Sequence, residues 1–520
     1  MSSSIDPALL VGAAVLLVAV VAVRLSARLG LPSLVFYLLI GMAIGESGLG
    51  IQFGNAELAR ILGSYALVLI IAEGGLTTRL AVVRPVVAPA ALLATVGVFV
   101  SAGVIGLLVH VLLHQPWQLA FLYGAVLSST DAAAVFSTLR RVRVLPRMGA
   151  ILEAESGVND APAVILVVTL STLSTAGAGL WWHHVLLIAY ELAAGALLGL
   201  AVGAAGAYGL RRVALPAAGL YPLAAIGLTV LAYAAGSSLH ASGFLAVYVT
   251  GLVLGNARIP HRQAVLGFAD GVAWLGQIGL FVLLGLLVSP PHLPEAVLPA
   301  LLVGVIAIVF ARPVAVALSV SWFRLSDAGD FRLSDAGDLV GRRRRHWRRS
   351  VRDQAFLSWA GMRGAVPIVF ATIPLSVGVV GADRLFNVVF VLVVVYTVLQ
   401  GGTIAPVAHW LRLTSADEPT ELNVETAPLD RMRADLLQLS IPAGSHLAGV
   451  YIDELRLPPG AVVTLVLRDG SGFVPDPRTR LRGGDDLLIV ATADVRDLAE
   501  RRLRAVGRRG RLARWLGDVG

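Results

Sequence analysis

The sequence predicts an all-α polytopic membrane protein with about 13 transmembrane helices, inverted repeats and two broken crossing helices, followed by a small cytoplasmic α/β domain. The 520 residues are 57% hydrophobic and only 14% charged. Apolar runs of about 20 residues, long enough to cross a bilayer, recur as far as residue 412. The loops between these runs alternate between arginine-rich and arginine-poor. Beyond residue 412 the pattern changes to short alternating segments typical of strands.

Dividing the apolar runs at charge clusters and at Gly/Pro turns gives the transmembrane spans. The first run, at residues 9–23, lacks a basic n-region and a cleavage site of small residues, so we expect a retained helix and not a signal peptide. The predicted spans are 7–27, 33–45, 57–76, 86–112, 117–139, 148–173, 183–210, 217–236, 243–257, 263–288, 295–323, 353–377 and 384–411.

The alternating loops also predict the orientation. One set contains nearly all the loop arginines, including Arg140, Arg141 and Arg143 and the cluster at 342–349. The other set contains a single arginine, Arg384. Basic loops stay in the cytoplasm, so the N-terminus is expected outside and the C-terminus inside a bacterial inner membrane.

Composition excludes several classes of protein. The chain has no cysteine, which excludes disulfides, iron–sulfur clusters and thiolate metal sites. The net charge of +8 lies in loops, where the membrane orientation explains it, so no nucleic-acid partner is expected. The sequence has no nucleophile–base pair and no metal-ligand cluster, so we expect neither an enzyme nor a bound metal or other cofactor.

Span five carries a polar patch at mid-membrane depth. Ser128, Ser129, Thr130 and Asp131 are consecutive, and Asp131 lies about eight residues from the basic loop, roughly 12 Å at helical rise. Serine and threonine can hydrogen-bond the helix backbone and open it, and freed carbonyls can then face a cation. The alternative is that Asp131 only bends the helix.

Span six supplies the second polar group. Asp160 lies roughly 20 Å beyond Arg147 at helical rise. Ser156 and Asp160 are four residues apart and share a helix face, and Glu155 and Asn159 share the neighbouring face. An ionisable group at this depth is costly and indicates function by default, although a structural carboxylate between helices is the alternative for Asp160.

Span twelve offers a counter-charge. Arg363 lies about eleven residues inside the basic end, roughly 17 Å, between Gly361, Gly364 and Pro367. These residues are typical of a broken transporter helix, so interruptions in the two halves of the chain predict an inverted-repeat transporter. We expect Glu155 and Arg363 to form a structural ion pair, which leaves Asp160 as the free carboxylate that exchanges a proton for a cation.

These motifs resemble a known family. The runs SSTDAAAVFS, ESGVNDAPAVI and GMRGAVPI, in this order, are similar to the monovalent cation:proton antiporter superfamily, within its sodium/proton exchanger (NhaP/NHE-like) branch. The resemblance implies a thirteen-helix homodimer with a mobile core. Asp160 would carry the cation and proton, Thr130, Asp131 and Ser156 would line the site, and Asn159 would support it. Asn159 before Asp160, in place of a second acid, implies electroneutral exchange.

The C-terminal part reads as a linker, a module and a basic tail. Residues 413–430 are acidic and without periodicity, 431–498 form the α/β module, and 499–520 read as a basic helical tail. Strands are predicted at 435–441, 461–468 and 486–491, a helix at 445–455 and a hairpin at 470–477. The module resembles the C-terminal (TrkA-C-like) domain of regulators of potassium conductance, which implies a dimeric gate with a small-molecule or ion regulator at 431–498.

The sequence therefore predicts a secondary antiporter that exchanges K+, or Na+, for H+ across the lipid bilayer, under control of the module, in pH, cation and cell-volume homeostasis. Two rivals stay open at this stage, a ligand-gated cation channel and a membrane sensor without transport. A channel would need a ring of ligands, commonly carbonyls from several chains. K+ and Na+ bind the same oxygen ligands, so the residues do not separate a K+/H+ antiporter from a Na+/H+ antiporter with little K+ activity.

Overall fold

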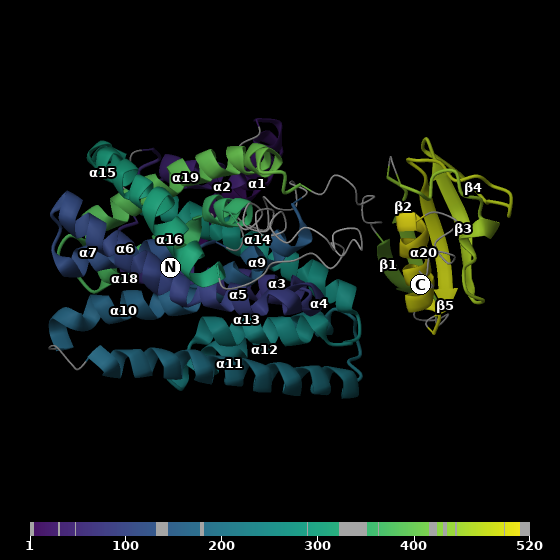
Figure 1. Ribbon diagram of the computed structural model, residues 1–520, viewed down its shortest axis with the longest axis horizontal. Coiled ribbons are helices and arrows are strands. Elements are labelled where there is room, and N and C mark those ends of the chain that lie inside the picture. Colours follow the sequence, from purple (N-terminus) through teal and green to yellow (C-terminus); the bar gives the residue numbers. More distant parts are fainter. Residues whose placement is uncertain are drawn as a thin grey trace, which may run out of the picture. The chain divides into compact units, whose positions relative to one another are not determined.

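The fold is described from a computed structural model. The structure describes residues 5–29, 32–46, 48–51, 53–131, 144–176, 181–288, 290–321, 351–361, 363–414, 424–429, 434–442, 445–492 and 494–509. The basic loops at 140–143 and 342–349 therefore lie outside the described residues. The chain divides into two compact units, residues 1–414 and 415–520 (Figure 1).

Unit 1 is helical, because a long apolar run can hydrogen-bond its backbone within a membrane only by forming a helix or a closed barrel. One group of helices packs mainly around α3 and α13. It consists of α1 (Ile5–Leu29), α2 (Ser33–Ile44), α3 (Ala56–Thr77), α11 (Trp181–Arg212), α12 (Leu220–Ser238), α13 (Gly243–Asn256) and α14 (Arg262–Leu287). Figure 1 shows α11, α12 and α13 lying side by side.

The second group holds the polar motifs of spans five, six and twelve. Its elements are α4 (Leu80–Val83), η2 (Arg84–Val86), α5 (Val87–Ala94), α6 (Val96–Leu113), α7 (Trp117–Ser128), α9 (Pro146–Val158), α10 (Asp160–Ala176), η3 (Pro290–His292), α15 (Leu293–Val305), η4 (Ile306–Ala311), α16 (Arg312–Val320), the helix Val351–Ala360, α18 (Ala365–Ser376) and α19 (Ala382–Trp410). The two groups meet chiefly where α3 packs on α18. There Gly63 lets Val369 approach closely.

Seven helices among the described residues are long and apolar enough to cross a membrane, and the bent pair Val351–Ala360 and Ala365–Ser376 makes an eighth. Four shorter apolar helices accompany them: Leu10–Ser26, Ser33–Ile44, Trp117–Ser128 and Gly243–Asn256. The structure thus confirms a polytopic, mostly helical protein. It does not confirm the number thirteen or an inverted repeat.

One helix of the second group changes its winding at a proline. Pro313 has no N–H and cannot donate to the carbonyl of Val309, as an α-helix would require. The chain accommodates this with a π-helical stretch, η4, directly before α16. The first residue after the stretch is Arg312, which is 3% exposed.

Unit 2 contains a five-stranded antiparallel sheet in the order β1-β2-β5-β3-β4. The elements are β1 (Val424–Leu429), β2 (Ala434–Ser440), η7 (Asp453–Leu455), β3 (Ala461–Arg468), β4 (Ser471–Phe473), β5 (Asp486–Thr492) and α20 (Arg496–Arg509). Leu437, Val466 and Ile489 on the sheet form one apolar core with Leu503 of α20.

The three predicted strands and the hairpin of this unit are confirmed. Two expectations are corrected. Residues 445–455 form turns and the short 3-10 helix η7 instead of a helix, because the chain there closes onto Thr479 and Leu481 through backbone hydrogen bonds. The interval assigned to the linker contains β1, which pairs with β2 along six residue pairs.

Candidate functional site

The polar residues of unit 1 gather where two helix interruptions meet. Helix α7 ends at Ser128, and Ser129 is extended, with φ −74° and ψ 153°. Between Ala360 and Ala365 the second helix is interrupted and bends by 56°. The two breaks are joined directly, since the backbone N–H of Ala365 donates to Asp131 Oδ2 at 2.7 Å.

This contact places a carboxylate at the N-terminus of α18. The first N–H groups of a helix lack partners within the helix and carry a partial positive charge, so a buried carboxylate is stabilised there. Gly364 makes the approach possible. A Cβ at this position would lie 1.9 Å from Asp131 Oδ2, so any side chain would displace the carboxylate.

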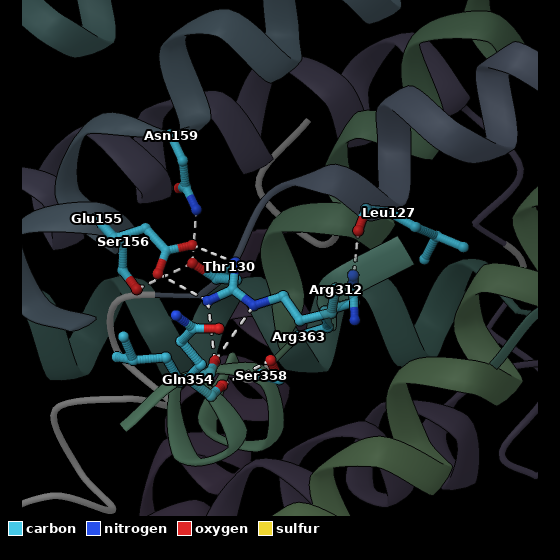
Figure 2. Close-up of polar contacts among 10 residues, drawn as sticks. Leu127, Thr130, Glu155, Ser156, Asn159, Arg312, Gln354, Ser358 and Arg363 are labelled. Carbon is cyan, nitrogen blue, oxygen red and sulfur yellow. Dashed lines mark hydrogen bonds and ion pairs between the residues drawn. The ribbon is translucent and has the colours of Figure 1, made fainter. Parts of the chain in front are cut away.

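Arg363 has the complementary position at the other break. Its Nε donates to the carbonyl of Leu127, in the last turn of α7, at 2.6 Å (Figure 2). Its guanidinium lies 5.6 Å from the ring centre of Tyr396, whose hydroxyl donates to the carbonyl of Gly304 at 2.5 Å. A positive charge is favourable at the C-terminal end of a helix. Arg363 of the second break therefore stabilises the end of α7, as Asp131 of the first break stabilises the beginning of α18.

Thr130, Ser156 and Asn159 form a hydrogen-bonded group across the breaks. The Thr130 and Ser156 hydroxyl oxygens are 3.0 Å apart, and Asn159 Nδ2 donates to Thr130 Oγ1 at 2.5 Å (Figure 2). All three side chains are buried. The structure thus brings together residues of spans five and six that are 26 and 29 positions apart.

Asp160 is the first residue of α10, and its side chain is 2% exposed. Its Oδ1 has no hydrogen-bond partner among the described residues, and the same is true of Asn159 Oδ1 and Ser129 Oγ. Buried polar atoms in proteins are nearly always hydrogen-bonded, so three unpartnered oxygens on neighbouring motif residues call for an explanation. Within the described part of the chain, no three His, Cys, Asp or Glu side chains are grouped as a resident metal site would need.

Glu155 has a different partner from the predicted one. Both of its carboxylate oxygens accept hydrogen bonds from the Arg312 guanidinium, through Nη1 and, at 2.7 Å, through Nη2 (Figure 2). Arg312 also donates from Nε to the carbonyl of Leu357 at 3.3 Å. Arg363 is engaged at the α7 break, so the predicted Glu155–Arg363 pair is replaced by Glu155–Arg312.

The sequence reasoning missed Arg312, although a signal for it exists. Arg312 lies inside the apolar run 295–323, followed by Pro313, and an arginine in such a run has the same diagnostic value as Arg363. Gly361 lets its side chain pass, because a Cβ there would lie 2.6 Å from Arg312 Nε.

A second ion pair lies at the beginning of α9. Arg147 Nη2 is 3.2 Å from each carboxylate oxygen of Asp353, which is 3% exposed. It joins the first turn of α9 to the helix Val351–Ala360. Two contacts therefore connect α9 to the helix Val351–Ala360. One is the Arg147–Asp353 pair, and the other is Arg312, which contacts both Glu155 and Leu357.

Comparison with known families divides the chain as its architecture does. Residues 14–410 match the sodium/hydrogen exchanger family, transmembrane part. Residues 436–504 match the TrkA-C domain. The first match covers unit 1 and includes both breaks and the buried charged residues.

Similar proteins span nearly the whole chain. A K+/H+ antiporter NhaP of Alkalimonas amylolytica is 37% identical over 505 residues, which are 95% of this chain and 83% of that protein. A K+/H+ antiporter NhaP2 of Shewanella oneidensis is 33% identical over 99% of this chain and 87% of its own length. The sodium proton antiporter MjNhaP1 of Methanocaldococcus jannaschii shares the fold, with a TM-score of 0.62 at 21% identity, over 78% of this chain and 97% of that one.

Proposed function

The chain belongs to the sodium/hydrogen exchanger family, and we propose that it exchanges K+ for H+ across a bacterial inner membrane by electroneutral alternating access. The family supports a cation/proton antiporter. The preference for K+ is supported by relatives named as K+/H+ antiporters, and by the TrkA-C domain, which would regulate exchange in pH, cation and volume homeostasis.

The observation that carries the proposal is the buried carboxylate of Asp160, whose Oδ1 has no hydrogen-bond partner among the described residues. Among the described residues, five buried charged side chains lie at the breaks or in the ion pair beside them: Asp131, Glu155, Asp160, Arg312 and Arg363. Asp353, on the helix before the second break, is also buried and is paired with Arg147. Of the five, three are negative and two are positive, so one negative charge is left over.

Glu155 is held by Arg312, and Asp131 is hydrogen-bonded by the α18 N-terminus. Arg363 donates to the carbonyl of Leu127 and not to a carboxylate, so its charge offsets one of the two remaining negative charges only at a distance. Asp160, whose Oδ1 has no partner among the described residues, is therefore the carboxylate on which we place the remaining charge.

A buried carboxylate without a counter-charge is costly unless it binds a proton or a cation. The two ligands compete for the same group. One positive charge therefore travels in each direction, which makes exchange electroneutral and couples the two fluxes.

The unpartnered oxygens supply ligands of the right chemistry. K+ and Na+ are hard cations, and hard cations bind to carboxylate, carbonyl and hydroxyl oxygen. Asp160 Oδ1, Asn159 Oδ1 and Ser129 Oγ are buried oxygens of this kind. Asn159 Nδ2 donates to Thr130, and this hydrogen bond fixes the amide so that its oxygen is left for the ion. Thr130, Ser156 and Asp131 then line and brace the site.

The arrangement in the membrane belongs to the same proposal. We propose 13 spans with inverted repeats, a homodimer in the bilayer, the N-terminus outside and the C-terminus in the cytoplasm. The division of unit 1 into two helix groups supports a static group around α3 and α13 and a moving group that carries both breaks. No resident cofactor is proposed, and a small molecule or ion would regulate exchange at 431–498.

A Na+/H+ antiporter is the second candidate, because the protein that shares the fold is a sodium proton antiporter. Proteoliposomes with an internal pH dye separate the two, with K+ and Na+ added in turn. We expect K+ to collapse the pH gradient in wild type and not in Asp160→Asn. A response to Na+ alone would make Na+ the substrate. If Asp160→Asn exchanges as fast as wild type, Asp160 is structural and the mechanism fails.

A further inference from the structure

The chain leaves unit 1 through a short contact with the ion-site helix. After α19, Leu413 accepts a hydrogen bond at its carbonyl from the backbone N–H of Leu145, at 2.9 Å. Thr414 and Val144 form an isolated antiparallel bridge beside it. We name these four residues the exit bridge. Unit 1 ends at Thr414, so the bridge is its last described contact before the chain continues to unit 2.

The exit bridge is anchored in the protein interior. Leu413 is 4% exposed and belongs to the main apolar core of unit 1. Val144 and Leu145 pack against the same core. A force on the chain at Thr414 therefore acts on a backbone contact that is anchored in the core by Leu413, while Val144, Leu145 and Thr414 are partly buried.

The other half of the bridge is the start of α9. Leu145 immediately precedes that helix, and Glu155 lies ten residues further on, roughly 15 Å along the axis. Because α9 is a continuous hydrogen-bonded helix, a displacement of its first turn also moves its last turn. The Arg147–Asp353 pair in the same first turn carries the displacement to the helix Val351–Ala360 as well. Helix α9 also carries Ser156, whose hydroxyl contacts Thr130 at the first break. Both interruptions at the ion site are thus connected to the exit bridge.

We propose that the exit bridge couples the TrkA-C domain to the ion site, so that a conformational change of the domain alters exchange by shifting α9 through the Leu145–Leu413 hydrogen bond. The proposal rests on the proposed function, because it names the regulation of the same site. The domain lies close along the chain, since β1 begins at Val424, ten residues after Thr414.

One substitution can remove this hydrogen bond selectively. Leu145 has φ −51° and ψ 132°, which proline can adopt, and the residue before proline prefers the extended conformation that Val144 already has in the bridge. Leu145→Pro therefore removes the donor. Leu145→Ala loses the same side chain but keeps the N–H, so it is the matched control. A short Gly-Ser insertion after Ser415 separates the domain from an intact bridge.

All variants are assayed as full-length chains in proteoliposomes, by K+-dependent proton flux. We expect Leu145→Pro to change the rate at least about threefold relative to Leu145→Ala, and the insertion to change it in the same direction. The two changes combined should have no larger effect than either alone. Equal rates for Leu145→Pro and Leu145→Ala, no effect of the insertion, or effects that multiply would each overturn the coupling. Absence of flux in wild type would instead overturn the proposed function.

A disulfide provides a reversible rescue. Val144 and Thr414 face each other as a non-hydrogen-bonded pair, whose Cα atoms are about 4.5 Å apart, within the range that a disulfide spans. The chain has no native cysteine to interfere. In the Leu145→Pro background, oxidation of Val144→Cys/Thr414→Cys should restore the Leu145→Ala rate, and dithiothreitol should abolish the rescue. If oxidation forms the bond and the rate does not change, the bridge transmits nothing.

Discussion

Glu155 and Asp160 are five residues apart on neighbouring helices of the same span, and both are almost fully buried, at 1% and 2% exposure. Glu155 has a bidentate guanidinium partner from α16, whereas Asp160 Oδ1 has no partner among the described residues. The two carboxylates are equally buried, so the presence or absence of an arginine partner is what distinguishes their roles. A buried carboxylate that has a permanent arginine partner within the protein helps to hold helices together. A buried carboxylate without an arginine partner must obtain its compensating positive charge from solution.

Removing the partner of Glu155 should have the largest effect on stability. Arg312→Met leaves a buried carboxylate uncompensated, which costs about 3–5 kcal/mol. Replacing both charges, as in Glu155→Leu/Arg312→Met, should recover most of that loss, because an apolar pair of similar volume needs no compensation. Thermal unfolding of the purified protein in detergent measures both.

Asp160→Asn is the matched control for that series. It removes a carboxylate whose Oδ1 has no partner among the described residues, so we expect no fall in unfolding temperature. If the double variant is as unstable as the sum of its single changes, the Glu155–Arg312 contact is not the pair that the structure describes.

A second test moves a carboxylate without changing any charge. Gly364→Ala would place a Cβ 1.9 Å from Asp131 Oδ2 and push it away from the Ala365 N–H. Loss of a hydrogen bond to a charged group costs about 1.5–3 kcal/mol, so exchange should fall roughly 10- to 100-fold. Gly149→Ala, on α9 with open space around the added Cβ, is the control in the flux assay. Equal rates for the two variants would show that the position of Asp131 does not matter.

Unit 2 contains another buried carboxylate paired with arginine, Asp485, and we expect its removal to have a smaller effect. Burial raises the pKa of Asp485, but hydrogen bonds from the Arg468 side chain and the Arg482 backbone, with the charges of both, hold the pKa below its usual range. A lowered folded-state pKa stabilises above the unfolded pKa of about 3.9, and that stability is lost as pH falls through the folded value.

We therefore expect wild-type unit 2 to lose stability below about pH 4, and Asp485→Asn to be less stable at neutral pH with a weaker acid dependence. Circular dichroism melts of residues 415–520 at several pH values measure this. An unchanged neutral melting temperature in Asp485→Asn would mean that pairing with Arg468 contributes nothing to the fold.

The parts of the site that could be predicted are those with a local signature. A Ser-Ser-Thr-Asp run, an Asn-Asp pair and a Gly/Pro-flanked arginine stand out in apolar sequence, and the structure places both breaks at such runs. Which arginine meets Glu155 depends instead on how distant helices pack. Arg312 reaches Glu155 because the π-helical stretch before Pro313 sets its position and because Gly361 has no side chain to block it.

Unit 2 also contains elements that local sequence predicts and elements that depend on contacts with distant residues. Strands β3 and β5 could be predicted because each is a short apolar run bounded by turn or charged residues; burial alternates along β5, and a register shift between Val463 and Leu465 interrupts the alternation in β3. β1 could not, because Val424–Leu429 has no alternating pattern and is a strand only through its pairing with β2. The interval 445–455 has apolar residues at helical spacing, but its backbone hydrogen bonds go to Thr479 and Leu481.

We propose that Asp160, among the buried carboxylates of the described residues, is the one that exchanges a proton for a cation. Proton release on addition of K+ to purified protein in weakly buffered detergent solution tests it most directly. We expect about one proton released per cation bound in wild type, none in Asp160→Asn, and unchanged release in Glu155→Leu/Arg312→Met. Release from Asp160→Asn equal to that of wild type would contradict it.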